Sequence, residues 1–282
     1  MAIARSLLIA TKNGKGEKKS GHTDWEQEHI PSIFKVTTCK RHSSVCQKER
    51  CEKVRIKMHL VIRRFRPSDG DAVRALFRDG IQEHINPSFT HAVRQPLYVG
   101  LTLLLCVGGY LLAGRLLAAC CAGAWLGLLY CCCYELYAGF VRERLRTDMR
   151  DIQRSYLSDP DNSFLVAEAE VEGRPRCVGM VAVEGKTEAG SGRRYGELFR
   201  MIVSSACRRS GLGTRLAQAA VDFCRERGFS KVVLETSSTQ RAAVALYRKM
   251  GFTLTHTHTI TEAPQWVTRL TRVTILRMEK SL

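Results

Sequence analysis

The spacing of apolar positions changes along the chain, and each spacing predicts a different element. Residues 59–65 alternate between apolar and polar and predict a strand. Apolar positions at helical spacing over residues 73–81 predict a helix, which we expect to end before Asn86-Pro87. The later part of the chain predicts, in order, an amphipathic helix over 145–157, strands over 164–169, 177–184 and 196–204, a helix over 214–228, a strand over 231–235, a helix over 239–250 and closing strands up to residue 282.

One segment between these elements is almost purely apolar. Residues 97–114 carry no charge, Arg115 follows, and residues 116–134 are again uncharged. Each half is close to the roughly 20 residues that cross a bilayer core, and an arginine in the middle of a single spanning helix would be costly. We therefore predict a hydrophobic membrane hairpin over residues 97–141 with Arg115 at its tip. Two full spans, a shallow re-entrant hairpin and a buried helical pair are all compatible with this pattern.

Basic residues stand at both outer ends of the apolar segment. Arg94 precedes it, and Arg142, Arg144 and Arg146 follow it. Because positive residues favour the cytosolic side of a membrane, both flanks of the predicted hairpin are expected to be cytosolic.

The N-terminal part of the chain differs in composition from the rest. Residues 1–57 contain 13 lysines and arginines against 6 acidic residues, which is typical of a disordered basic arm. Four side chains there invite comparison with a zinc site, but their irregular spacing amid many charges favours a loose polar tail without metal. They are Cys39, His42, Cys46 and Cys51.

The whole chain of 282 residues has a net charge of +17, which points to an anionic partner such as a phosphorylated cofactor or an acidic membrane surface. The charge is spread along the chain without interleaved aromatic residues or zinc-finger spacing, so nucleic acid is not the predicted partner. Six of the 12 cysteines lie in the apolar segment, and the others show no convincing pairing. This usage predicts reduced thiols and a domain that faces the cytosol.

A turn rich in arginine and glycine follows the strand predicted at residues 196–204. It runs from Arg208 to Gly213, and a helical pattern begins at Thr214. The first turn of a helix has unpaired N–H groups and partial positive charge, so it can bind a phosphate, and glycines let the backbone approach the ligand closely. The turn lacks the Gly-Lys-Ser/Thr ending of a P-loop and the three glycines of a dinucleotide fingerprint. An exposed turn without a ligand is the alternative.

The order of the predicted elements and two motifs together resemble the Gcn5-related N-acetyltransferases. The first motif is Arg-x-x-Gly-x-Gly at residues 208–213, and the second is the Ala-x-x-Tyr…Gly-Phe pattern at residues 245–252. From about Met58 onward, the chain resembles the family 8, camello-like membrane N-acetyltransferases. The feature that makes this resemblance specific is the apolar hairpin between the first two predicted helices. The implied fold is α/β (α+β), with a mixed central sheet flanked by helices and an inserted membrane hairpin. The implied regions are a basic arm (1–57), the first strand and helix of the domain (58–96), the hairpin (97–141) and the rest of the domain (142–282).

The resemblance also implies acetyl-coenzyme A as co-substrate and no metal. In that superfamily a splayed strand pairs its backbone with the pantetheine, here at Met201 and Val203, in the manner of strand addition to a sheet edge. Gln240 stands near the position where many members carry an asparagine that contacts the coenzyme, which puts this contact in doubt. The turn that would hold the pyrophosphate comprises Arg208, Arg209, Ser210, Gly211, Leu212, Gly213 and Thr214.

Two residues are the candidates for proton transfer. An amine must lose a proton before it attacks a thioester, and Glu197 matches the place of a catalytic glutamate in several superfamily members. On a regular strand Glu197 would share a face with Phe199, Met201 and Val203; a solvated residue at the strand start is an equally weighted alternative. Tyr247 matches the superfamily's usual general acid, against the alternative of a packed core tyrosine. His84 and Glu235 are weaker alternatives for the base.

These observations predict an N-acetyltransferase anchored in the endoplasmic reticulum membrane with a cytosolic catalytic domain. A small amphiphilic acceptor such as a cysteine S-conjugate is the leading substrate, because a site beside a bilayer suits an apolar tail. N6-acetylation of lysines on endoplasmic reticulum proteins is the alternative, and a membrane scaffold without catalysis is the second alternative.

Overall fold

The computed structural model describes residues 30–33, 57–171 and 174–282. Most of the predicted basic arm, including the four cysteine and histidine residues weighed as a zinc site, lies outside these residues. Within the arm, strand β1 (Ile30–Ile33) pairs antiparallel with β2 (Lys57–Arg64). The expectation that residues 1–57 contain no regular structure was therefore wrong for this strand.

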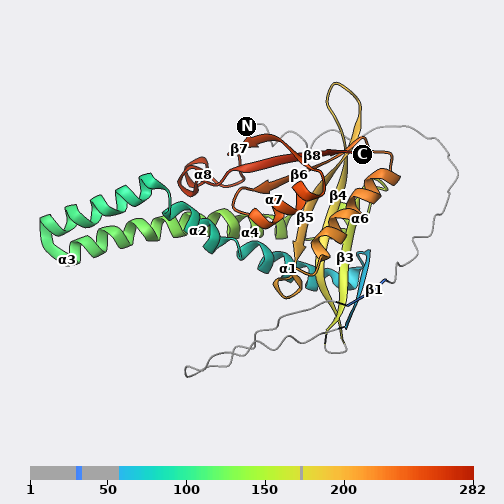
Figure 1. Ribbon diagram of the computed structural model, residues 1–282, viewed down its shortest axis with the longest axis horizontal. Helices are drawn as coiled ribbons and strands as arrows, with labels where there is room; N and C mark the ends of the chain where they lie inside the picture. The colour runs from blue at the N-terminus through green and yellow to red at the C-terminus, as the bar shows by residue number, and fades with distance from the viewer. Residues whose placement is uncertain (1–29, 34–56, 172–173) are drawn as a thin grey trace.

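In the described part of the chain, eight strands form one sheet in the order β1-β2-β3-β4-β5-β6-β8-β7. Neighbouring strands are antiparallel, except that β5 and β6 are parallel. The predicted mixed sheet is thus present (Figure 1). The remaining strands are β3 (Ser163–Val171), β4 (Arg174–Thr187), β5 (Arg194–Val203), β6 (Lys231–Ser237), β7 (Thr253–His258) and β8 (Ile275–Ser281).

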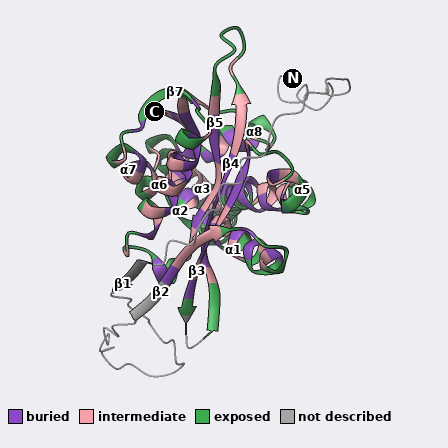
Figure 2. Cartoon of the chain, turned by 90° about the vertical axis from the view of Figure 1, so that its right-hand side faces the viewer, coloured by how far each residue is buried: buried purple, intermediate pink, exposed green. Residues whose placement is uncertain are grey.

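Helices cover both faces of this sheet, and its central strands are buried between them (Figure 2). On one face, α6 (Leu212–Glu226) and α7 (Arg241–Lys249) pack on a cluster that includes Leu198, Leu216 and Tyr247. On the other face, a second cluster that includes Phe77 and Phe199 joins the sheet to three helices. These are α1 (Gly70–Gln82), α4 (Phe140–Arg146) and α5 (Ile152–Tyr156).

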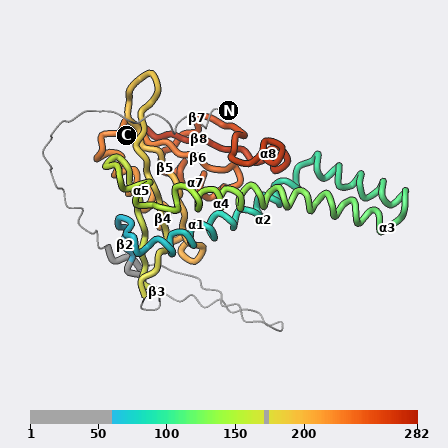
Figure 3. Tube along the Cα trace, turned by 180° about the vertical axis from the view of Figure 1, so that it is seen from behind, coloured from blue at the N-terminus to red at the C-terminus, as the bar shows by residue number. Residues whose placement is uncertain are grey.

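The apolar segment forms α3 (Pro96–Tyr134), which is interrupted at its middle. Ala113 and Gly114 have non-helical backbone angles, Gly114 with a φ of 77°, and the chain doubles back there so that two arms project from the domain (Figures 1 and 3). A Cβ on Gly109 would lie 2.7 Å from the Ala118 Cα, so the arms are in close contact. Arg115 directly follows the break, where the sequence placed the tip. By length and composition, the helical stretch from Pro96 to Arg146 is apolar enough to cross a membrane, and only 17% of its most apolar window is buried.

The root of this hairpin packs against α2 (Ile85–Val93) and α8 (Gln265–Thr271). A π-helical turn (Glu135–Gly139) joins α3 to α4. The sequence did not predict α2, because Asn86-Pro87 was expected to end a helix. Pro87 instead lies in the first turn of α2, where its missing N–H removes no helical hydrogen bond. Helix α8, which falls in a region expected to form only strands, was also missed.

The amphipathic helix predicted over residues 145–157 is interrupted. Helix α4 ends at Arg146, and α5 begins at Ile152 after a turn. The Asp151 side chain accepts a hydrogen bond from the Arg154 backbone N–H at 3.0 Å and so caps a new helix. The interruption places Asp148 beneath the sheet, where its carboxylate takes part in the ion pair described below.

Candidate active site

The two parallel strands of the sheet pair over a short distance only. Strand β5 is in register with β6 at three successive residues and the pairing ends at Leu198 and Leu234. Both strands continue beyond that point, β5 to Val203 and β6 to Ser237, without pairing each other. The inner edge of β5 from Phe199 to Val203 therefore has no neighbouring strand, and such an edge can pair with an extended ligand.

A β-bulge accounts for this divergence. Met180 of β4 pairs with Ile202, whereas Ala182 pairs with Phe199, so Arg200 and Met201 together face a single residue of β4. Arg200 has a φ of 52°, in the left-handed region that non-glycine residues rarely adopt. A bulge bends its strand and increases its twist, and this bulge lies directly after the last paired residue of β5.

The Arg200 side chain is held by a buried ion pair and three aromatic rings. Its Nε donates to the Asp148 Oδ2 at 2.9 Å, and only 9% of the side chain is exposed. Burial raises the pKa of Asp148, but the Arg200 charge and the hydrogen bonds from Arg200 and Tyr156 outweigh burial and bring this pKa below its ordinary value. The guanidinium lies 5.4 to 5.8 Å from the ring centres of Phe77, Phe140 and Phe199. No pattern in the sequence indicates this ion pair, because its partners are 52 residues apart.

The bulge changes which side chains share a face. Glu197 and Phe199 both lie beside Lys186, whose Nζ is 2.6 Å from the Glu197 Oε2 and 4.9 Å from the Phe199 ring centre. Met201 and Val203, by contrast, pack with the cluster under α6 and α7. The expectation that all four share one face was therefore wrong beyond Phe199, because the extra residue in the bulge reverses the alternation.

The predicted phosphate turn lies at the N-terminus of α6, and two of its residues have left-handed backbone angles. Arg209 and Gly211 have φ values of 62° and 82°, and Gly211 is the N-cap of the helix. Left-handed residues before a helix N-terminus are typical of concavities in which backbone N–H groups point at an anion. The helix starts at Leu212, two residues earlier than expected, so the N–H groups of Leu212, Gly213 and Thr214 belong to its first turn.

The side chains of this turn differ in what they can offer an anion. Arg208 is ion-paired with Glu83, and the Ser210 hydroxyl donates to the Cys207 carbonyl at 2.6 Å. Arg209 is exposed. A Cβ on Gly213 would lie 3.4 Å from Leu246 and 3.7 Å from Met201, so the turn adjoins both the free edge of β5 and α7.

Tyr247 of α7 faces the same strand edge. Its hydroxyl is 3.3 Å from the Met201 sulfur, and its ring packs edge-on against Phe252. Burial raises the pKa of Tyr247 far above its ordinary value, so the hydroxyl keeps its proton at neutral pH. Glu197 lies on the opposite face of β5, so the structure brings together Tyr247, Met201 and the turn but does not bring Glu197 into contact with Tyr247. Gln240 is the N-cap of α7, and its Oε1 accepts from the Thr236 hydroxyl at 2.9 Å.

Sequence reasoning missed a hydroxyl cluster at the end of β6. The Tyr137 hydroxyl, from the π-helical turn at the hairpin root, lies 3.3 Å from the Ser237 Oγ and 3.0 Å from the Thr239 Oγ1. The His84 ring centre is 6.1 Å from that of Tyr137. Burial and the nearby Arg208 charge lower the pKa of His84, so this imidazole is neutral at pH 7. The hairpin root therefore lies at the diverging end of the parallel strands.

Two further expectations can be placed on the structure. Glu235 is exposed and lies 3.4 Å from both Arg277 and His258, which indicates a structural ion pair. Within residues 30–33, 57–171 and 174–282, no group of three His, Cys, Asp or Glu side chains is placed to hold a metal.

Comparison with known proteins defines the class of this site. Residues 130–252 match the sequence profile of the family described as "Acetyltransferase (GNAT) family". That region contains the divergent strands, the turn before α6 and Tyr247, so the chain is an acetyl-coenzyme A-dependent N-acetyltransferase.

Similarity to individual relatives gives the narrower family. The chain is 35% identical over 199 residues to the probable N-acetyltransferase camello of Xenopus tropicalis, covering 68% of this chain and 84% of that protein. It is 37% identical over 197 residues to N-acetyltransferase family 8 member 3 of Mus musculus, covering 68% and 83%. The chain therefore belongs to the family of the N-acetyltransferase 8 and camello proteins. A solved acetyltransferase of the GNAT family from Staphylococcus aureus Mu50 aligns with a TM-score of 0.46 and 12% identity, covering 79% of this chain and 99% of that one.

Proposed function

We propose that this chain is a membrane-anchored enzyme that transfers acetyl from acetyl-coenzyme A to the amine of a small amphiphilic acceptor, such as a cysteine S-conjugate. One observation carries this proposal. The hydrogen bonds of Tyr137 join the root of the apolar hairpin to Ser237 and Thr239, at the end of β6 that diverges from β5. An acceptor with an apolar tail in the bilayer could therefore present its amine close to the site.

The residues present fit the coenzyme. The N–H groups at Leu212, Gly213 and Thr214 and the exposed Arg209 would hold the pyrophosphate, since both the helix N-terminus and the guanidinium favour anions. The free edge of β5 at Met201 and Val203 would pair with the pantetheine amides. When bound, the coenzyme supplies an activated thioester. Gln240 uses its carbonyl oxygen within the protein and keeps its amide N–H groups for a contact.

Two side chains are proposed to move protons. Tyr247, which is buried and protonated, would donate its hydroxyl proton to the leaving thiolate. Glu197 would accept the amine proton. Its Oε2 already accepts a hydrogen bond from Lys186, so the remaining lone pairs of the carboxylate are the acceptor sites. The neutral His84 is the alternative base, because it lies near the hydroxyl cluster at the end of β6.

The hairpin is proposed to be the membrane anchor. Each arm of about 17 to 20 residues at about 1.5 Å per residue is some 25 to 30 Å long, which is close to the thickness of a bilayer core. Its outward side chains are apolar; Leu111, Leu112 and Leu116 are each more than three-quarters exposed. Basic residues flank both roots, so the catalytic domain would face the cytosol, with the endoplasmic reticulum as the expected membrane.

Acetyl transfer by the detergent-solubilised full chain tests this function. Labelled acetyl-coenzyme A is offered with S-benzylcysteine and, in parallel, with a lysine peptide. We expect turnover of S-benzylcysteine. Turnover of the peptide alone would replace the cysteine conjugate with protein lysine as the acceptor. Binding of the coenzyme without turnover of either acceptor would contradict the proposed acceptor and favour the scaffold, and absence of coenzyme binding would refute the assignment of the turn before α6.

A further inference from the structure

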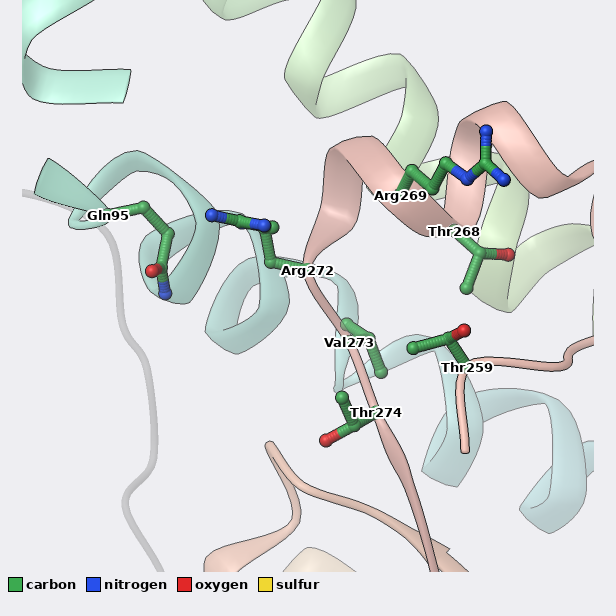
Figure 4. A pocket seen from close by; sticks show the side chains of 7 residues that line it. All are labelled: Gln95, Thr259, Thr268, Arg269, Arg272, Val273 and Thr274. Carbon is green, nitrogen blue, oxygen red and sulfur yellow. The ribbon is translucent and has the colours of Figure 1, made fainter. Parts of the chain in front are cut away.

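A cavity at the hairpin root lies outside the proposed active site. Its volume is about 330 Å³, which is within the range of small-molecule sites. It lies between α8, the segment that joins α8 to β8, and Gln95, which is the residue directly before α3 (Figure 4). The lining residues are Gln95, Thr259, Thr268, Arg269, Arg272, Val273 and Thr274.

The walls of this cavity offer hydrogen-bond donors and positive charge. The Arg272 side chain extends toward Gln95, whereas that of Arg269 extends along the opposite side (Figure 4). Arg272 has a φ of 55°, a conformation that a non-glycine residue keeps only when its surroundings impose it. No carboxylate lines the cavity, and among the described residues neither arginine has a salt bridge. The cavity is therefore an uncompensated cationic site.

A second cavity of similar size, on the other side of the hairpin root, provides a contrast. Its volume is about 300 Å³. Its lining includes Arg142 and Arg146, but three glutamates line it with them, namely Glu135, Glu143 and Glu262. Arg142 is ion-paired with Glu135, and Glu262 is ion-paired with Arg144, which lies outside the lining. Acidic side chains outnumber arginines in its lining, so of these two cavities the one at Arg272 is the one that calls for an external anion.

The position of the Arg272 cavity indicates where that anion comes from. Gln95 adjoins the first residue of the apolar hairpin, so the cavity is level with the point where the hairpin leaves the domain. Trp266 on α8 is 56% exposed and Ile260 is 63% exposed, and tryptophan is enriched where a protein meets lipid headgroups. Anionic lipids concentrate at cytosolic membrane surfaces and attract nearby arginines.

We propose that this cavity binds the phosphate of an anionic phospholipid headgroup. The Arg272 guanidinium would bind two phosphate oxygens, which its planar donors match. The hydroxyls of Thr259 and Thr274 would supply further hydrogen bonds. The bound lipid would fix α8 and the hairpin root at the membrane surface. This inference rests on the proposed membrane insertion of the hairpin.

Titration calorimetry of the full chain in maltoside micelles tests the proposal with three probes. They are dihexanoyl phosphatidic acid, dihexanoylglycerol, which has the same chains without phosphate, and inorganic phosphate. We expect the phosphatidic acid to bind at least about tenfold more tightly than either other probe, because a charged hydrogen bond and the acyl chains both contribute. Equal binding of dihexanoylglycerol would overturn the phosphate site, and equal binding of inorganic phosphate would overturn the lipid assignment.

Two matched variants locate the site. Arg272→Gln and Arg94→Gln each remove one positive charge from an exposed arginine near the hairpin root, but only Arg272 lines the cavity. We expect Arg272→Gln to weaken phosphatidic acid binding about tenfold or more and Arg94→Gln to change it less than about twofold. Equal losses in both would show diffuse attraction and overturn the proposal. If Arg272→Gln does not fold, the three titrations of the wild type still decide whether the chain binds the phosphate of a lipid.

Retention of the wild-type chain in membranes after an alkaline carbonate wash separates this inference from the proposed function. Loss of the protein in the wash would refute membrane insertion itself. Retention and acetyl transfer without selective lipid binding would refute only the headgroup site.

Discussion

Leucines in the core of the domain and leucines near the tip of the hairpin have opposite environments in the same chain. Leu216 of α6 and Leu234 of β6 are at most 1% exposed, whereas Leu112 and Leu116 in the hairpin are 83% and 82% exposed. Removing apolar surface from water stabilises the first pair within the domain. The second pair is left largely exposed, and an exposed apolar surface of this extent marks a partner or a membrane. The comparison shows that one region buries its leucines within the domain, whereas the other leaves them exposed.

Substitution of Tyr247 is expected to have the largest effect, and it tests whether catalysis depends on the sheet domain and not on the hairpin. We expect Tyr247→Phe to lower kcat by about 10²-fold or more, the usual contribution of a general acid. The variant keeps the ring that packs on Phe252 and loses only the hydroxyl near Met201, so its melting temperature and membrane retention should match those of the wild type. Steady-state rates with saturating acetyl-coenzyme A measure the change. An unchanged kcat would show that Tyr247 is only a core residue.

A pair of leucine substitutions tests the comparison directly. Leu216→Ala should lower the free energy of unfolding by about 2 to 5 kcal/mol, because the fully buried side chain leaves a cavity. Leu112→Ala should leave the stability of the domain within about 0.5 kcal/mol of the wild type, since surface substitutions rarely do more. Thermal and urea unfolding in detergent compare the two. A large loss in the Leu112 variant would mean that the hairpin packs on the domain.

The ion pair at the bulge allows a test by substitution and by pH. Asp148→Asn should lower the free energy of unfolding at pH 7 by about 2 to 4 kcal/mol, because it leaves the Arg200 charge buried without its partner. It should also raise the KM for acetyl-coenzyme A, since the bulge sets the divergence of β5. Asp148→Glu is the control that retains the charge. A stability loss without any change in KM would show that the pair does not position the coenzyme edge.

The smallest expected effect is the pH dependence of the unfolding free energy, measured by acid titration of the wild type and Asp148→Asn. The pKa of Asp148 in the folded protein is lower than its ordinary value of 3.8. Its contribution to stability is therefore present above about pH 3.8 and is lost as the pH falls through the folded pKa. The wild type should lose its advantage over Asp148→Asn in this acidic window. A constant difference in unfolding free energy down to pH 2 would contradict this linkage.

The strands and helices around the predicted phosphate turn were predicted more fully than the geometry between them. The strand before residue 204, the turn and both following helices are in place, because each is encoded by local periodicity and glycine positions. Helix α7 turns Val244 and Tyr247 toward the core, because both are buried, whereas Ala242 and Ala245 are exposed. The face of Glu197 was assigned correctly relative to Phe199 but not relative to Met201, because a bulge depends on how β4 and β5 pair and leaves no periodic mark on β5 alone.

The sequence by itself determined most of the strands and helices around the sheet, the apolar segment with its reversal near Arg115, the glycine turn before α6 and the family. These follow from local spacing and short motifs, whose physical basis lies within a few residues. Only the tertiary structure decided the Arg200–Asp148 pair, the ending of β5–β6 pairing at Leu198 and the contact of Tyr137 with β6. These join segments from 36 residues apart, for Leu198 and Leu234, to 102 residues apart, for Tyr137 and Thr239. Such contacts depend on which surfaces the folded chain brings together, and that information is distributed over the whole core.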